Sequence, residues 1–391
     1  MTDASSHAES ERHGAVMAAA DATSDSHRDS HRDSHRERYL TLDVARGFAV
    51  LGMIWMHLVP ADGATTLLGE AVTLLTRFLE GKSAALFCVL AGIAWELQAQ
   101  RVESPRYFLR RTVTLALLGL ALHIVWPTEI LIPLALMMAV ALTVRARGRA
   151  ALVALGAVML CATPLLQAWL RPEIAADWSW GTGDTHRAEL GAGWATVRFL
   201  LIDGNYPVIP WLLFAIAGMR LFANGLPART RMRRWFMVSL FVLVDLQCWS
   251  WWTRTHPSAL GAARFFLTDT WIPTTLPFVV LSGAAAFVLL TGLLSLNPMW
   301  IRQRIAPVGA LGRASLTHYV AHILIVYLPL RAVWPDEIWP VRYGVAALLA
   351  YVIAALPLSV LWFSRFQHGP LESVWAVASG LARATNDGKS T

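Results

Sequence analysis

A succession of long apolar runs, separated by short polar or charged segments, constrains the fold of this chain more than any other feature of its sequence. Most of these runs approach the roughly 20 residues that a helix needs to cross the hydrocarbon of a bilayer. They lack the alternation of barrel strands, whereas helices satisfy their own backbone hydrogen bonds in lipid. The sequence therefore predicts an all-α polytopic membrane bundle of about ten transmembrane helices, at residues 42–60, 82–99, 107–126, 129–145, 149–169, 205–223, 234–252, 272–295, 314–332 and 341–362.

Composition agrees with this fold and excludes other classes. Of the 391 residues, 56% are hydrophobic and 15% are charged, a balance too apolar for a soluble globular protein. Cys88, Cys161 and Cys248 all fall within or beside predicted helices, so no disulfide framework is expected. The formal net charge of +7 reflects basic loops at the membrane surface, and we expect no nucleic-acid partner.

Basic residues gather in every second loop, which orients the predicted bundle. Short cytoplasmic loops carry the excess of Lys and Arg, so both termini are predicted to be cytoplasmic. We expect a multi-pass protein of a bacterial plasma membrane whose loops contact anionic lipids. The loops concerned contain Arg101, Arg106, Arg110 and Arg111; Arg145, Arg147 and Arg149; Arg220, Arg229, Arg231, Arg233 and Arg234; and Arg302, Arg304 and Arg313.

The two ends of the chain differ from the rest. Residues 1–37 are polar, and the tetrapeptide Asp-Ser-His-Arg occurs three times in succession up to Arg36. Low-complexity sequence of this kind predicts a disordered cytoplasmic tail rather than a metal site built from its histidines. We place the transmembrane domain at residues 38–376 and a second disordered tail at 377–391.

The first predicted span contains a permanent cation and a histidine, besides Asp43. A charge at the bilayer centre costs roughly 3 kcal/mol on insertion scales, so such residues normally face a protein interior or a wet cavity and mark function. Arg46 and His57 are separated by nearly three whole helical turns, so they lie on almost the same face, about 16 Å apart along the axis. Arg46 would be near the cytoplasmic end, where Asp43 can pair with it.

His57 would lie towards the outer end of the same span. Its unperturbed pKa, about 6.5, suits a general base at neutral pH. A histidine that hydrogen-bonds within the bundle, or that reaches the outer headgroups, explains the position equally well.

A cytoplasmic basic cluster opens the third span. Arg106, Arg110 and Arg111 largely set the topology, but guanidinium groups also bind phosphate in a bidentate manner. They are predicted on the same side of the membrane as Arg46, so a phosphorylated carrier could contact all four. We treat them as candidate donor-binding residues.

Two further segments could contact a substrate near the outer side. Lys82 starts the second span, where it could reach the headgroups, pair with Glu80 or orient a substrate. Segment 203–211 has two prolines near the start of the sixth span, which gives a partly unwound start that can expose backbone N–H groups to a ligand. Asn205 and Tyr206 are the candidates there, although the prolines also serve as structural punctuation.

A polar stripe opens the ninth span, in segment 312–322. His318 and His322 share a helical face at i, i+4, with Thr317 and Tyr319 beside it. Two histidines without further ligands at a telling spacing do not make a metal site, so no metal is expected. A stripe that lines a substrate site or hydrogen-bonds within the bundle is the preferred interpretation.

Some of these residues carry a family resemblance. Arg46-Gly47-Phe48 followed by His57 resembles the first span of bacterial acyltransferase family 3 proteins, in which an Arg, ten residues and a His recur. Segment 42–47 also resembles the heparan-alpha-glucosaminide N-acetyltransferase catalytic family. In that lysosomal enzyme an Asn stands where His57 stands here, and the catalytic His lies in the loop before the second span. This chain has no His between His57 and His123, so that histidine has no counterpart.

Three further stretches resemble a large group of bacterial membrane proteins of unassigned function that share the architecture of this transmembrane acyltransferase superfamily. They are Gly81-Lys82 with Leu86-Phe87, segment 312–319 and Gly369-Pro370-Leu371-Glu372. The last stretch also begins a short amphipathic segment expected at the cytoplasmic interface.

The resemblance implies acyl transfer across the bilayer. Cytoplasmic acetyl-CoA, or another acyl-CoA, would be the co-substrate, with no permanently bound cofactor. Arg46 and the Arg110/Arg111 pair would hold the donor, and His57 would deprotonate the acceptor directly, without an acyl-enzyme. The expected partners are membrane lipids, acyl-CoA and a carbohydrate or lipid-linked acceptor, and a homodimer is left open.

A proton-coupled small-molecule transporter is the alternative. Intramembrane Arg and His also serve such carriers, and the broken start of the sixth span fits a substrate site. The sequence shows no convincing internal repeat between its halves, which disfavours this alternative. A non-catalytic lipid-binding or assembly scaffold would have no donor site.

Overall fold

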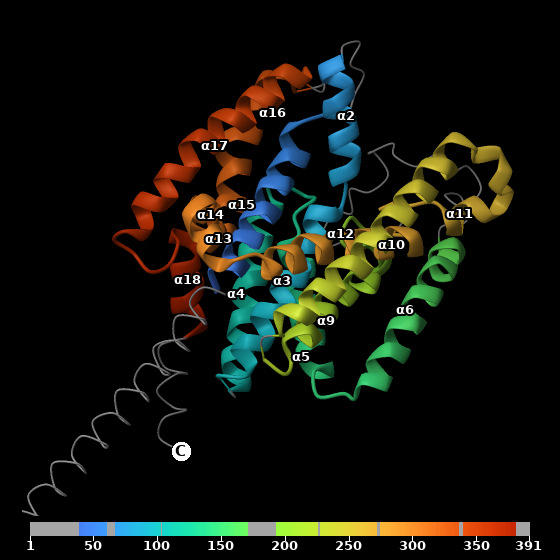
Figure 1. The fold of residues 1–391 in the computed structure, drawn as a ribbon, viewed down its shortest axis with the longest axis horizontal. Helices are drawn as coiled ribbons and strands as arrows, with labels where there is room; N and C mark the ends of the chain where they lie inside the picture. The colour runs from blue at the N-terminus through green and yellow to red at the C-terminus, as the bar shows by residue number, and fades with distance from the viewer. Residues whose placement is uncertain are drawn as a thin grey trace, which may run out of the picture.

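The computed structural model describes residues 39–60, 67–102, 104–170, 193–225, 227–271, 274–335 and 339–380. Within these ranges the chain is a helical bundle without strands (Figure 1). The predicted N-terminal tail lies outside the described residues. The C-terminal boundary predicted at residue 376 falls inside a helix that continues to Ser379.

Each predicted span corresponds to a helix or to a set of consecutive helices. The elements in chain order are a first helix Tyr39–Leu58, α2 Leu67–Leu79, α3 Lys82–Ala99, α4 Pro105–His123, α5 Leu131–Val144, α6 Arg149–Leu170, α8 Trp194–Arg198, the π-helix η1 Phe199–Asp203, α9 Val208–Phe222, α10 Arg229–Thr255, the 3₁₀ helix η2 Pro257–Ala263, α11 Arg264–Leu267, α12 Leu276–Ser295, α13 Pro298–Arg304, α14 Ala306–Arg313, α15 Ser315–His322, the π-helix η3 Ile323–Tyr327, α16 Leu328–Val333, α17 Val341–Phe363 and α18 Pro370–Ser379.

Length and hydropathy mark seven helical segments of the described chain as able to cross a membrane, α2–α3 and α15–α16 each counting once. The apolar helices α5 and α9 are shorter, with 14 and 15 residues, and α4 begins with three arginines in its first two turns. The chain is thus an all-α polytopic membrane bundle.

Local sequence signals set several helix starts. Ser104 accepts a hydrogen bond from the Tyr107 amide at 3.4 Å, and Pro105 follows it at the first position of α4. Thr275 caps α12 in the same way, accepting from the Phe278 amide. Capping hydroxyls and an early proline suit the first turn because its N–H groups have no partner in the helix.

The centre of the bundle is built on close contact between helix backbones. A Cβ atom added at Gly92 of α3 would overlap the Ala215 carbonyl of α9, and one added at Gly218 of α9 would overlap the Val89 carbonyl. Such glycines let helices approach closely in a bilayer, where packing rather than hydrophobic exclusion drives association. The pair α3 and α9 therefore forms a rigid centre.

The first helix is held by a second set of close contacts. A Cβ atom at Gly312 of α14 would overlap the Asp43 carbonyl, and one at Gly47 would overlap the Val308 carbonyl. At its other end, the Leu58 carbonyl accepts from Trp339 Nε1 at 2.7 Å and touches Gly344 of α17. Both ends of the first helix are thus fixed against the C-terminal helices.

The outer helices face away from this core. α6 and α17 flank the bundle on opposite sides in Figure 1, and only 22% of the apolar window of each is buried, against 56% for the first helix. Large apolar side chains such as Phe241 of α10 and Ile353 of α17 are exposed. These surfaces suit contact with lipid tails.

We predict that Gly218→Ala lowers the melting temperature of the protein in detergent. The added methyl group has to displace the α3 backbone, and overpacking of this kind costs about 1–3 kcal/mol. Gly156→Ala is the matched control, because its Cβ would meet only the Leu213 side chain at an ordinary 3.5 Å. Equal melting temperatures for the two variants would contradict the close α3–α9 contact.

Candidate active site

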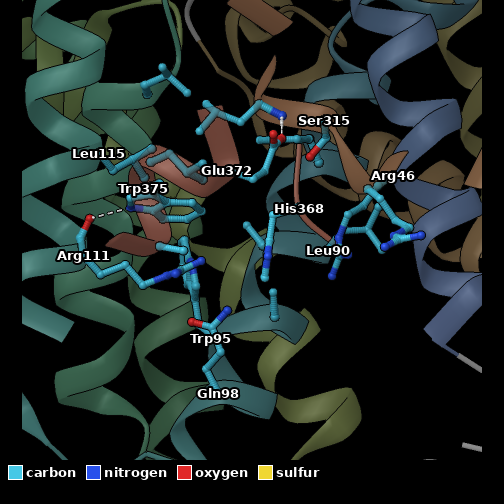
Figure 2. Close-up of a pocket in the computed structure, with 18 of the residues that line it drawn as sticks. Arg46, Leu90, Trp95, Gln98, Arg111, Leu115, Ser315, His368, Glu372 and Trp375 are labelled. Atoms are coloured by element: carbon cyan, nitrogen blue, oxygen red, sulfur yellow. Dashed lines mark hydrogen bonds between the residues drawn. The ribbon is translucent and has the colours of Figure 1, made fainter. Parts of the chain in front are cut away.

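A cavity of about 470 Å³ lies beside α18, between the first helix, α3, α4, α5, α14 and α15 (Figure 2). Its lining residues on α3 run from Phe87 to Gln98, about 16 Å along the helix axis. The space is therefore elongated along α3. Its apolar lining consists mainly of Phe87, Leu90, Leu115, Leu131, Leu134 and Leu316.

Four arginines line the cavity: Arg46, Arg101, Arg111 and Arg313. Arg46 pairs with Asp43 at 2.6 Å, the pairing that its sequence spacing suggested. Arg101 donates to the Tyr39 hydroxyl, and Arg313 donates to the Gln367 carbonyl at 2.9 Å. Among the described residues, the cavity thus has one guanidinium in a salt bridge with a carboxylate and three whose hydrogen bonds go to neutral groups.

Arg111 is the most buried of these cations, at 8% exposure. Its guanidinium lies 3.4 Å from the centre of the Trp375 ring, it donates to the Tyr107 hydroxyl at 3.3 Å, and its Nε atom has no hydrogen-bond partner in the described part of the chain. A desolvated cation without a carboxylate is costly unless an anion is supplied. The cavity therefore favours an anionic ligand at Arg111.

The predicted basic cluster divides between two faces of α4. Arg106 and Arg110 are exposed and do not line the cavity. Positions 106 and 110 share one helical face, while 107 and 111 share the neighbouring one that points inwards. The sequence places Arg313 only in a basic loop that is predicted to be cytoplasmic, but in the structure Arg313 lines the cavity.

His57 lies outside this cavity, in a hydrogen-bonded pair with a second histidine. Its Nδ1 atom is 2.8 Å from Nε2 of His322, and the planes of the two rings are nearly parallel, at 13°, with centroids 5.1 Å apart. His322 Nδ1 lies 3.0 Å from the His318 carbonyl. These contacts join the end of the first helix to the end of α15.

The protonation of the pair follows from its hydrogen bonds. A carbonyl oxygen only accepts, so His322 must carry its proton on Nδ1, and its neutral Nε2 then accepts from His57 Nδ1–H. His57 keeps the lone pair of Nε2. The hydrogen-bond network therefore makes His57 Nε2 the basic atom of the pair.

Aromatic side chains surround His57. The Trp126 ring lies 5.0 Å away and the Tyr319 ring 6.4 Å away, and Tyr319 Oη accepts from the Ile130 amide at 3.2 Å. Ile130 precedes the cavity residue Leu131, and Tyr319 lies one turn after the cavity residue Leu316. Tyr319 therefore contacts the backbone next to one cavity residue, lies one turn from another, and has His57 as a ring neighbour.

The rest of the polar stripe on α15 is occupied within the protein. His318 contacts the Tyr351 hydroxyl and the Ser359 hydroxyl, each at 2.8 Å. Thr317 Oγ1 donates to Glu372 at 2.6 Å. Of the predicted stripe, His322 is thus the member that reaches His57. Among the described residues, no three His, Cys, Asp or Glu side chains gather in a way that could hold a metal ion.

The other predicted substrate residues cluster near the starts of α3 and α9. Lys82 is buried, with Nζ 5.6 Å from the Phe78 ring. Asn205 is buried and its Nδ2 atom has no partner in the described chain, while the Tyr206 ring packs against Trp211 at 5.1 Å. Ile209 has non-helical backbone angles, so the start of α9 is irregular, as the prolines predict.

Sequence patterns missed several residues that complete the site. Glu372 and Trp375 line the cavity from α18, which packs into the bundle against α4 and α15. Burial raises the pKa of the Glu372 carboxyl above its ordinary range, while hydrogen bonds from Thr317 and Leu316 act in the opposite direction. The available signal was an acidic residue two positions after Pro370 in an otherwise apolar segment.

Two family models match the chain. Residues 216–380 match a model described as a protein of unknown function (DUF418), which includes α14, α15 and α18. No curated protein and no solved structure matches. Residues 38–249, more than half of the chain, match the model described as heparan-alpha-glucosaminide N-acetyltransferase, catalytic. The chain therefore belongs to the heparan-alpha-glucosaminide N-acetyltransferase catalytic family and is a multi-pass, acetyltransferase-like membrane protein.

Proposed function

We propose that the protein moves an acyl group, most simply acetyl, from cytoplasmic acyl-CoA to an amine or hydroxyl of a sugar, lipid or cell-envelope acceptor on the outer side of a bacterial plasma membrane. The observation that carries this proposal is the first helix, which contributes Arg46 to an arginine-lined cavity and the half-buried His57 to a pair with the buried His322. The two residues are about 16 Å apart along that helix.

The cavity suits the donor. Its volume of about 470 Å³ is in the range of small-molecule sites, which run from about 300 to 1,000 Å³. Coenzyme A carries phosphates that Arg46, Arg111 and Arg313 could hold through bidentate contacts. The apolar wall along α3 suits the pantetheine arm, and the inner end adjoins Tyr319, beside His57.

The histidine pair suits general-base catalysis. His57 Nε2 would take the proton of the acceptor amine or hydroxyl as that group attacks the thioester carbonyl. The C–S bond breaks, a C–N or C–O bond forms, and the proton passes from His57 to the departing thiolate. His322 would fix the tautomer of His57 and accept its Nδ1–H throughout, as the third group of a catalytic triad does.

Direct transfer fits these contacts better than an acyl-enzyme. In the described structure, the hydrogen bond of His57 goes to an imidazole rather than to a Ser or Cys hydroxyl or thiol. A nucleophile needs such a bond to its activating base. The acceptor itself is then the nucleophile, and Lys82, Asn205 and Tyr206 are the candidates for orienting it.

We predict that His57→Ala keeps donor binding and loses acyl transfer. Purified protein in detergent should melt at a higher temperature with acetyl-CoA, and the variant should show the same shift because His57 lies outside the cavity. Transfer of labelled acetyl from acetyl-CoA to glucosamine or to cell-envelope extract should fall roughly 10²- to 10⁴-fold, the usual contribution of a general base. His322→Ala should cause a smaller loss.

The wild-type protein also separates this proposal from the alternative. If no acyl-CoA raises the melting temperature, and if proteoliposomes accumulate solute only under a pH gradient, the protein is a transporter and the acyltransferase proposal is wrong.

We predict that Arg111→Gln weakens donor binding. Removing a charged hydrogen-bond donor costs about 1.5–3 kcal/mol, so the dissociation constant for acetyl-CoA, measured by calorimetry, should rise about 10- to 100-fold. Arg231→Gln on α10 is the matched control, because it removes a charge on the same predicted side of the membrane but outside the cavity. Equal affinities for the two variants would count against this donor site.

A further inference from the structure

The helix α15, which carries His322, lacks a cap from its own sequence. Its N-cap residue is Ala314, which makes no side-chain capping bond. The first N–H groups of a helix have no partner within it and need one from elsewhere. The start of α15 therefore depends on another part of the chain.

Glu372 of α18 supplies this cap from 55 residues away. Its Oε1 atom accepts from the Leu316 amide at 2.7 Å and from the Thr317 amide at 3.2 Å, and its Oε2 atom accepts from Thr317 Oγ1 at 2.6 Å. Figure 2 shows Glu372 beside Ser315, the first residue of α15. Leu371 adds a bond from its amide to Thr317 Oγ1 at 3.0 Å. A negative charge at a helix N-terminus is also favoured by the helix dipole.

The same carboxylate lines the cavity with four arginines. In the described structure it pairs with none of them, because both its oxygens are engaged by α15. Its contacts therefore favour a structural role towards α15 over a direct role in holding the donor.

The position of the α15 start bears directly on the histidine pair. His322 lies five residues after Thr317, about 7.5 Å along the axis. Directly after His322 the regular helix gives way to the π-helix η3, in which the hydrogen-bonding pattern changes. A cap that fixes the start of α15 would therefore also bear on the rotation and height of His322.

We propose that Glu372 is a positioning residue for acyl transfer: by capping α15 it holds the His322 imidazole at hydrogen-bond distance from His57. The inference rests on the proposed function of the histidine pair. The helix α18 also packs Trp375 on Arg111 and donates from Trp375 Nε1 to the Arg111 carbonyl at 3.0 Å. One short helix thus joins the donor cavity to the helix that orients the base.

The test compares Glu372→Gln and Glu372→Ala with the wild-type protein in three measurements. These are the melting shift with acetyl-CoA, the kcat and KM for acetyl transfer to glucosamine, and the imidazole ¹⁵N spectrum of histidine-labelled protein. We expect the donor shift and the KM for acetyl-CoA to stay near wild type. The kcat should fall on the order of 10- to 100-fold, the cost of misplacing a reacting group by about 1 Å.

The ¹⁵N signals that disappear in His57→Ala and His322→Ala should shift in both Glu372 variants. Glu372→Gln should recover part of the loss seen in Glu372→Ala, since the amide oxygen still accepts from the Leu316 amide. Thr317→Val leaves the sequence of α18 unchanged but removes the hydroxyl that donates to Glu372 and accepts from the Leu371 amide. It should lower kcat in the same way, which keeps the proposal testable if Glu372→Ala does not fold. Val374→Ala, at an exposed position of α18, is the matched control.

Wild-type kcat and unshifted histidine signals in Glu372→Gln and Thr317→Val would overturn the proposal. Loss of donor binding with unshifted histidine signals would also overturn it, because Glu372 would then act on the donor. The proposed function fails in a different way: wild-type protein would not respond to acetyl-CoA, while the ¹⁵N spectra would still report whether Glu372 positions the histidine pair.

Discussion

The close approach of the first helix to α14 is the contact on which the candidate site depends. Gly312 lies against the Asp43 carbonyl, and Gly47 lies against the Val308 carbonyl, so neither position has room for a side chain. This contact places Arg46 and Arg313 at one cavity. Further along, the same first helix meets α15, where His57 and His322 pair. Both parts of the site thus include residues from the first helix and from segment 306–322, and the close approach of these two segments explains why a glycine follows Arg46.

Some features of the candidate site can be predicted from the sequence, because burying an ionisable side chain in an apolar helix costs free energy. Arg46 and His57 stand out because ionisable groups inside an apolar run need partners, and the i, i+4 spacing of His318 and His322 correctly indicates a polar stripe within the bundle. Spans found by hydropathy correspond to helices for the same reason, since an apolar run of that length has few other folds in lipid.

What the sequence does not predict depends on contacts between distant segments. His57 and His322 are 265 positions apart, and nothing local to either selects the other. On α4 the charge pattern alone makes Arg106, Arg110 and Arg111 equivalent, whereas packing against α18 turns only Arg111 inwards. The sequence places Glu372 in an interfacial segment and cannot show that it caps α15, a distant helix that has no side-chain cap of its own.

The chemical nature of the histidine pair suits its location. A triad that ends in a carboxylate would place a permanent negative charge deep in the bundle, where desolvation is expensive. Here the chain of hydrogen bonds ends at the His318 carbonyl, which orients His322 without any charge. The nearby carboxylate of Glu129 is instead directed at the amides of Leu131 and Ile132 at the start of α5. The proposed reaction would therefore create charge only while the acceptor proton resides on His57, and proton transfer to the leaving thiolate would remove it again.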